Sequence, residues 1–128
     1  MDVGPRREAL MARLADMPGA VASPVMAPRG RTPVGMIYKV VDKMFAIVGL
    51  GQVEHVILKC DPHLVEVLRE TYAGVGHRSH LDRRHWISVE LQTDVPAKEI
   101  DRLVDQSYDL VCATLTRKQR AELAARGG

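Results

Sequence analysis

Residues 34–62 are VGMIYKVVDKMFAIVGLGQVEHVILKCDP, a stretch that predicts a meander of antiparallel strands leading into a helix. Its runs of β-branched and aromatic residues are short and separated by turn-forming positions, Val41-Asp42 and Gly49-Leu50-Gly51. We therefore expect three strands, at 34–40, 43–48 and 53–59.

The end of this stretch predicts the start of a helix. The Asp61 side chain can accept a hydrogen bond from the free amides of a first helical turn, and Pro62 suits the first helical position. The expected helix covers 62–72 and stops before Gly74. Its inward stripe is Leu64, Leu68 and Tyr72, with Val65 beside it.

Upstream of the strands, the chain has a second kind of pattern. Leu10, Met11, Leu14 and Met17 recur at helical spacing, which predicts a helix over 6–17 that ends at Pro18-Gly19. The segment 20–33 contains three prolines and little periodicity, so we expect an irregular surface connection there.

Downstream, residues 77–91 alternate in polarity. Ile87, Val89 and Leu91 fall on one face of a strand, and Trp86, Ser88 and Glu90 on the other. A tight turn around Leu81-Asp82 and a short strand at 77–80 would complete a second hairpin. The alternation also places His85 on the Ile87 side, as a partly buried histidine.

The longest helix is predicted to open at Pro96. Its core stripe is Ile100, Leu103, Val104, Tyr108, Val111 and Leu115. Thr116 and Gln119 have the spacing of a capping box for a short last helix that ends near Ala125. The elements follow the order α-β-β-β-α-β-β-α, which indicates an α+β two-layer sandwich: an antiparallel sheet of about five strands with helices on one face.

Composition limits the classes of protein open to this chain. Its 128 residues fit one domain, 1–128, and 46% hydrophobic with 27% charged residues is globular composition. A net charge of +2 excludes a histone-like balance. Two cysteines are too few for a disulfide framework, and no stretch has the length and apolarity of a signal peptide or membrane span. We expect a cytoplasmic protein without membrane contact.

The richest chemistry lies in residues 77–86, HRSHLDRRHW. Arginines can form paired hydrogen bonds to phosphate oxygens, and an indole can stack on a base, so this window favours nucleic-acid contact. Charged hairpin tips that are merely solvated, with Trp86 covering a sheet edge, are the alternative. Other bases could extend the patch: Arg29, Arg31, Lys39, Lys43, Arg117, Lys118 and Arg120. Residues 90–109, in contrast, carry six acids against two bases.

Signals for catalysis and for metal binding are weak. His77, His80 and His85 with Cys60 offer donor atoms, but their spacing does not suit ligands on one strand, and no metal is expected. No nucleophile-elbow or phosphate-cradling glycine motif is present, and Cys60 is best interpreted as a small buried side chain. We expect no cofactor and no enzymatic activity.

Four segments resemble the MmcQ/YjbR family in order and spacing, over about residues 34–115. They are Lys43-Met44-Phe45-Ala46, Leu58-Lys59-Cys60-Asp61-Pro62, His80-Leu81-Asp82-Arg83-Arg84-His85-Trp86 and Ser107-Tyr108-Asp109-Leu110-Val111. The resemblance implies a fold related to frataxin-like and secretion-chaperone-like proteins, with two hairpin wings for which DNA binding has been suggested. Asp82 stands where the family commonly has Asn, and we expect its carboxylate to neutralise part of the charge of Arg83 and Arg84.

Resemblance and charge together predict a DNA-binding protein that contacts the phosphate backbone without reading bases. Family motif positions supply Lys43, Lys59, His80, Arg83, His85 and Trp86, and the charge argument adds Lys39, Arg78 and Arg84. The alternative is a protein-interaction or chaperone-like module, binding a protein partner or a second copy of the chain, with no nucleic-acid role.

Overall fold

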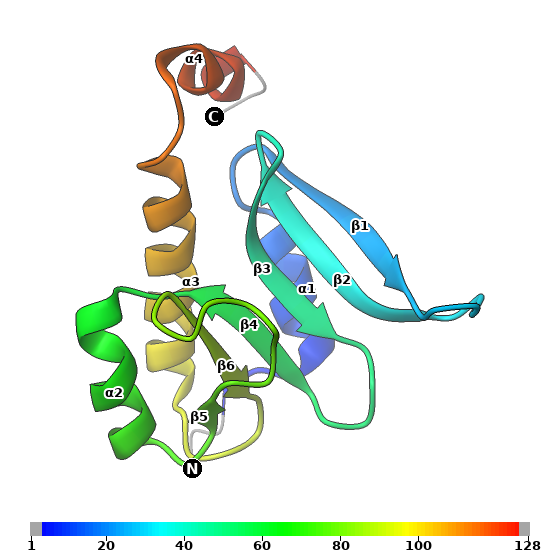
Figure 1. The fold of residues 1–128 in the computed structure, drawn as a ribbon, viewed down its shortest axis with the longest axis vertical. Helices are drawn as coiled ribbons and strands as arrows, with labels where there is room; N and C mark the ends of the chain where they lie inside the picture. Colours follow the sequence, from blue (N-terminus) through cyan, green and yellow to red (C-terminus); the bar gives the residue numbers. More distant parts are fainter. Residues whose placement is uncertain (1–3, 126–128) are drawn as a thin grey trace.

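A computed structural model describes residues 4–125 as an antiparallel sheet with helices, in the order α1 to α4 and β1 to β6 (Figure 1). The helices are α1 (Arg7–Ala15), α2 (Pro62–Thr71), α3 (Ala97–Cys112) and α4 (Arg117–Ala125). The strands are β1 (Ala20–Met26), β2 (Pro33–Val40), β3 (Lys43–Gly49), β4 (His55–Lys59), β5 (Val75–Gly76) and β6 (Trp86–Glu90).

The predicted fold class is confirmed, with one more strand than expected. The sheet has six strands in the order β1-β2-β3-β4-β6-β5, and every neighbouring pair is antiparallel. The three strands predicted for residues 34–59 are present as β2, β3 and β4. The β2–β3 turn consists of Val41 and Asp42, with φ of 45° and 65°. Left-handed backbone is unusual for a β-branched residue, and burial of the Val41 side chain in the core offsets its cost.

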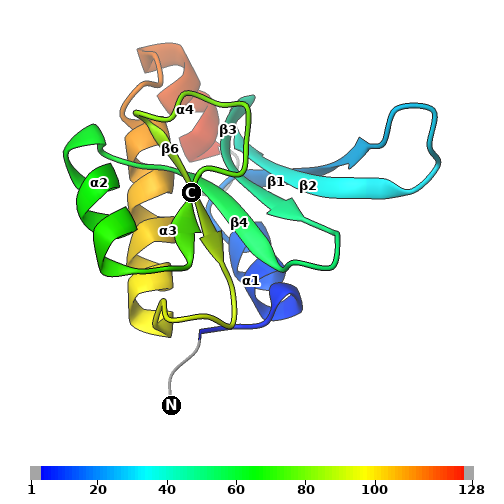
Figure 2. The same ribbon diagram turned by 60° about the horizontal axis from the view of Figure 1, so that its bottom comes forward.

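Helices α1 and α3 pack on one face of the sheet. In Figure 1 α1 lies behind β3, and in Figure 2 both helices lie on the same side of the strands. The stripe predicted for α3 is buried throughout. It packs mainly on β3 and β4, whose inward side chains Ala46, Val48, Val56 and Leu58 are fully buried. Helix α2 lies beside β5, at the far end of the sheet from β1.

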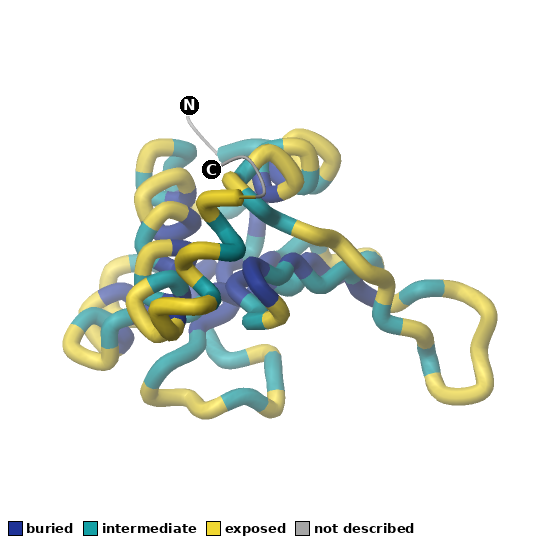
Figure 3. Tube along the Cα trace, turned by 90° about the horizontal axis from the view of Figure 1, so that it is seen from above, coloured by how far each residue is buried: buried dark blue, intermediate teal, exposed yellow. Residues whose placement is uncertain are grey.

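The prediction of an irregular connection over residues 20–33 is wrong. Residues 20–26 form β1, the edge strand, which pairs along β2 from Ala20 opposite Val40 to Met26 opposite Pro33. Most β1 side chains are exposed (Figure 3), so the strand is defined by backbone pairing and leaves no hydrophobic alternation in the sequence. An edge position also tolerates Pro24, which has no N–H to donate.

The strand predicted at 77–80 is also wrong. On the side away from β4, β6 pairs with the two-residue β5, at Val75–Gly76, and residues 77–85 form a loop. The turn occupies residues 83–85, after the predicted Leu81-Asp82, because the N–H groups of His85 and Trp86 both donate to the Asp82 carbonyl. His85 therefore precedes β6, and it is partly buried, as predicted, with its ring bonded to the Asp82 carboxylate. Its side chain is 41% exposed.

The capping box predicted for the last helix is present. The Thr116 N–H donates to Gln119 Oε1 at 2.9 Å, and the Gln119 N–H donates to Thr116 Oγ1 at 3.1 Å. The two bonds satisfy amides at the start of α4, as the spacing of the two residues predicted. Among residues 4–125, no helix has the length and apolarity needed to cross a membrane.

Candidate nucleic-acid interface

The sheet face that α1 and α3 leave uncovered is called the open face here. Lys59 and Trp86 are directly paired across β4 and β6, and Ile57 shares their face of the sheet. Ile57 pairs with Ile47, which pairs with Ile37, so Lys39, two residues after Ile37, points the same way. The open face therefore presents Lys39, Lys59 and Trp86, together with the half-buried Ile37 and Ile47.

The 77–85 loop crosses this face. In Figure 1 it passes in front of β4 and β6, on the opposite side of the sheet from α1. The Arg78 N–H donates to Ser88 Oγ at 3.2 Å, and Ser88 and Ile57 are buried although they point away from the helices. Seen from above in Figure 3, the loop and the β1–β2 hairpin both project from the sheet. The open face thus lies between this loop and the β1–β2 hairpin (Figure 3).

Asp82 organises the tip of the loop. Its Oδ1 accepts the Arg84 N–H at 2.9 Å, and its Oδ2 lies 2.7 Å from His85 Nδ1. The carboxylate is therefore bonded to a backbone amide and an imidazole; within residues 4–125 it makes no ion pair with Arg83 or Arg84, and the Arg84 charge acts on it only through space. Those two side chains stay exposed. Asp82 therefore neutralises the charge of Arg83 and Arg84 only in part.

The pKa of Asp82 lies below its ordinary value, because the Arg84 N–H and then the His85 ring bond to the ionised carboxylate. A lowered pKa in the folded state means that the carboxylate stabilises the loop at pH values above the ordinary pKa of an aspartate. That contribution is lost as the pH falls through the lowered value. In a carboxyl NMR titration, we expect the Asp82 midpoint to lie below that of the same residue in a free peptide of residues 78–88. Equal midpoints would contradict the turn.

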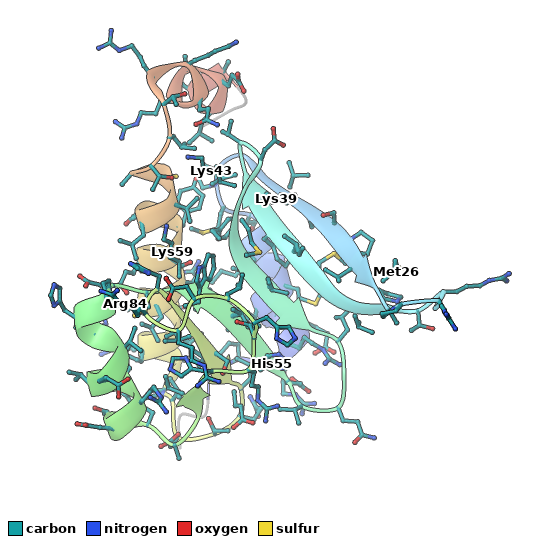
Figure 4. All side chains as sticks on the ribbon, viewed as in Figure 1. Met26, Lys39, Lys43, His55, Lys59 and Arg84 are labelled. Atoms are coloured by element: carbon teal, nitrogen blue, oxygen red, sulfur yellow. The ribbon has the colours of Figure 1, made fainter. Side chains whose placement is uncertain are left out.

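The predicted site residues separate into two groups. Lys39, Lys59 and Trp86 lie on the open face, and His80, Arg83, Arg84 and His85 lie on the loop that crosses it. Figure 4 labels Lys59 on β4 and Arg84 on the loop, with Lys39 on β2.

Two of the predicted contacts are already engaged elsewhere. Lys43 Nζ donates to the carbonyl and the hydroxyl of Thr114, at 2.9 and 3.1 Å, just beyond the C-terminal end of α3. There the ammonium satisfies a carbonyl of the turn that follows the helix. Arg78 forms an ion pair with Glu90. We leave Lys43 and Arg78 out of the interface proposed below.

The acids of residues 90–109 lie mostly on α3, behind the sheet. Arg13 of α1 binds two of them, with Nε 2.9 Å from Asp101 Oδ1 and an Nη 3.0 Å from Asp105 Oδ1. Glu99 of the same helix is paired with Arg102. The charge segregation visible in the sequence is therefore also a segregation between the two sides of the sheet.

Cys60, the residue after β4, was predicted to be a small buried side chain. Cys60 is 1% exposed, and burial raises the pKa of its thiol to about 11. It is a small buried side chain, as predicted, and not an activated nucleophile. Within residues 4–125, no group of three His, Cys, Asp or Glu side chains is placed to hold a metal ion.

Sequence reasoning missed the contribution of α2 to the surface beside the loop. His63 and Arg69 line a pocket together with His77, Arg83 and Arg84. His63 and Arg69 are six positions apart and precede the first loop residue, His77, by 14 and 8 positions, so no local motif connects them. Only the packing of α2 beside β5 brings them to the loop.

The sequence model of the YjbR family matches residues 15–110. That range includes β2 and β4, which carry Lys39 and Lys59, and the whole 77–85 loop. The chain belongs to the YjbR family. The match confirms the resemblance seen in the four motif segments.

Two relatives of this YjbR-family chain bear names that assign no activity. The uncharacterized protein YjbR of Escherichia coli K12 is 38% identical over 85 residues, which are 64% of this chain and 70% of the relative. The uncharacterized protein YyaQ of Bacillus subtilis is 33% identical over 76 residues, which are 59% and 64% of the two chains.

Two solved structures share the fold. A Deinococcus radiodurans protein with a DUF419 domain has a TM-score of 0.78 and 25% identity, over 91% of this chain and 86% of that one. A Pseudomonas syringae protein has a TM-score of 0.68 and 24% identity, over 84% and 99% of the two chains. The second likeness concerns the fold alone.

Proposed function

We propose that this YjbR-family protein binds DNA through its open face, by contacts to phosphates and without reading bases, and that its role is binding and not catalysis. The observation that supports this most is the distribution of charge. Lys39, Lys59, Arg83 and Arg84 lie on the open face and its loop, whereas the acids of α3 lie behind the sheet. A chain of net charge +2 thereby has one side that attracts a polyanion.

The placement of Trp86 adds a stacking surface to this charge. The indole is half-buried beside Lys59, on the same face of the sheet. An aromatic side chain between cations favours an unpaired base or a frayed duplex end, since stacking does not depend on base identity. Phosphate contacts would supply most of the affinity and little sequence preference.

Binding is expected to be weak and strongly salt-dependent. Four phosphate contacts give a slope of about −3.6 for the logarithm of affinity against that of salt, with dissociation constants of about 10⁻⁴ to 10⁻⁶ M near physiological salt. A fluorescence anisotropy titration of a labelled duplex should therefore lose about 150-fold in affinity between about 50 and 200 mM salt.

A matched pair of double variants tests which surface is responsible. Lys39→Ala with Lys59→Ala removes two open-face cations, and should weaken binding and reduce the slope by about 1.8. Lys98→Ala with Arg102→Ala removes the same charge from α3, behind the sheet, and should change binding little. An affinity that does not change with salt concentration, or an equal loss of affinity in the two double variants, would refute the proposal.

A further inference from the structure

A pocket of about 490 Å³ lies between α2 and the 77–85 loop. Most of its lining residues carry nitrogen donors, from three arginines and two histidines, and a single carboxylate faces them. The lining consists of Pro62, His63, Val65, Glu66, Arg69, His77, Arg83 and Arg84. The volume falls within the usual range for sites that bind small molecules.

The positive charge in this pocket is only partly neutralised. Glu66 is paired with Arg69 at 3.0 Å, across one turn of α2. Within the described residues, no ion pair involves Arg83 or Arg84. Two guanidinium groups that form no ion pair within residues 4–125 therefore line this pocket, and Glu66 supplies the one carboxylate in its lining.

The two acids nearest in sequence are occupied by other groups. The Asp82 carboxylate bonds to the Arg84 N–H and the His85 ring. The Asp61 carboxylate caps α2 by accepting the His63 N–H at 2.9 Å. Neither acid lines the pocket.

His77 adds to this region a ring nitrogen that has no hydrogen-bond partner among the described residues. Its Nδ1 is shielded from solvent and, within the described part of the chain, has no hydrogen-bond partner. A buried polar atom without a partner is destabilising, so such atoms are rare in folded proteins. The His77 ring also lines the pocket beside Arg83 and Arg84, so a ligand bound there would lie against this ring.

We propose that this pocket binds a phosphate monoester group, held by Arg83 and Arg84 with His77 and Arg69. Guanidinium groups bind phosphate oxygens through paired hydrogen bonds, and a monoester carries up to two negative charges and three terminal oxygens. The space exceeds that of a phosphate alone. Val65 and Pro62 line its apolar part, where the rest of the ligand would lie. The inference does not depend on DNA binding by the open face.

The same group can come from a small phosphorylated molecule or from the phosphorylated end of a nucleic-acid strand. Three probes separate these sources: inorganic phosphate, adenosine 5′-monophosphate with adenosine as its control, and a short single strand with a 5′-phosphate or a 5′-hydroxyl. We expect amide NMR shifts in α2 and the loop with phosphate at about 10 mM, and tighter binding of one phosphorylated probe than of its unphosphorylated control.

Variants of the full chain assign the effect to the pocket. Arg83→Ala and His77→Ala should each weaken binding of the phosphorylated probe about tenfold, since each removes a hydrogen bond to a charged group. Arg31→Ala removes an exposed charge outside the pocket and should change it less than about twofold. Equal losses in Arg31→Ala and Arg83→Ala, or phosphate shifts outside α2 and the loop, would overturn the proposal.

A fourth variant keeps this test separate from the DNA proposal. Lys39→Ala with Lys59→Ala leaves the pocket lining intact and should bind adenosine 5′-monophosphate like the parent protein. A protein that binds the probe but no duplex would refute DNA binding and support the pocket. A protein that binds duplex through Lys39 and Lys59 but ignores every phosphate monoester would refute the pocket alone.

Discussion

Phe45→Ala should lower the free energy of unfolding by about 3–5 kcal/mol, the usual range for removing a large aromatic side chain from a packed core. Phe45 is fully buried. Its ring packs edge-on against Tyr108 of α3 with centroids 5.3 Å apart, and lies 6.5 Å from the Tyr38 ring of β2. Removing the ring leaves a cavity between the sheet and its longest helix. Urea unfolding followed by circular dichroism would measure the lowered free energy of unfolding.

Two control variants make this expectation specific to packing. Phe45→Leu retains much of the volume and should cost clearly less than Phe45→Ala. Val21→Ala shortens an exposed side chain on the edge strand and should change stability by less than about 0.5 kcal/mol. If Phe45→Ala were as mild as Val21→Ala, the helix would not be held against the sheet by this ring.

The sequence predicted those parts of the fold in which a pattern and a buried face coincide. The α3 stripe and the β2 to β4 meander each bury one side, so periodicity revealed them. The β1 strand at Ala20–Met26 was missed because an exposed edge strand is held by backbone hydrogen bonds, which any side chain permits. The short β5 was missed for another reason: two residues are too few to show any alternation.

The candidate site was predictable in its residue types but not in its geometry. The charge of residues 77–86 identified the loop that crosses the open face. The roles of Lys43 and Arg78 depended on partners far away in sequence, Thr114 at one end of α3 and Glu90 on β6. A lysine in a strand has the same local pattern whether it meets a phosphate or a backbone carbonyl.

The four segments that carry the family resemblance meet in the structure. The His85 carbonyl accepts the Cys60 N–H at 2.7 Å, which connects the loop to the end of β4. One residue earlier, the Lys59 N–H donates to Ser107 Oγ, and that hydroxyl donates to the Phe45 carbonyl. Much of the shared motif set therefore maintains a junction between α3, β3, β4 and the loop. That junction positions the Lys59 side chain and the loop for the proposed function.

Ser107→Ala is expected to destabilise the fold by about 2–4 kcal/mol, because the hydroxyl satisfies two backbone groups at once. Ser107 is fully buried; it accepts the Lys59 N–H at 2.9 Å and donates to the Phe45 carbonyl at 2.6 Å. Pairing of β3 with β4 ends at Ala46 opposite Leu58, so Phe45 and Lys59 are the next residues along the two strands. The hydroxyl takes the place of the strand hydrogen bond that they do not make.

This insertion distinguishes Ser107 from the other serines of the chain. Ser88→Ala removes one acceptor, for the Arg78 N–H, and should cost about 1 kcal/mol, while the exposed Ser23→Ala should cost less than about 0.5 kcal/mol. Amide hydrogen exchange would add a local test, since the Lys59 amide should lose protection in Ser107→Ala more than other β4 amides do. Unchanged stability and exchange would mean that β3 and β4 can close directly on each other. The Ser107 hydroxyl would then contribute nothing to the stability of the junction, and Lys59 would hold its position without help from α3.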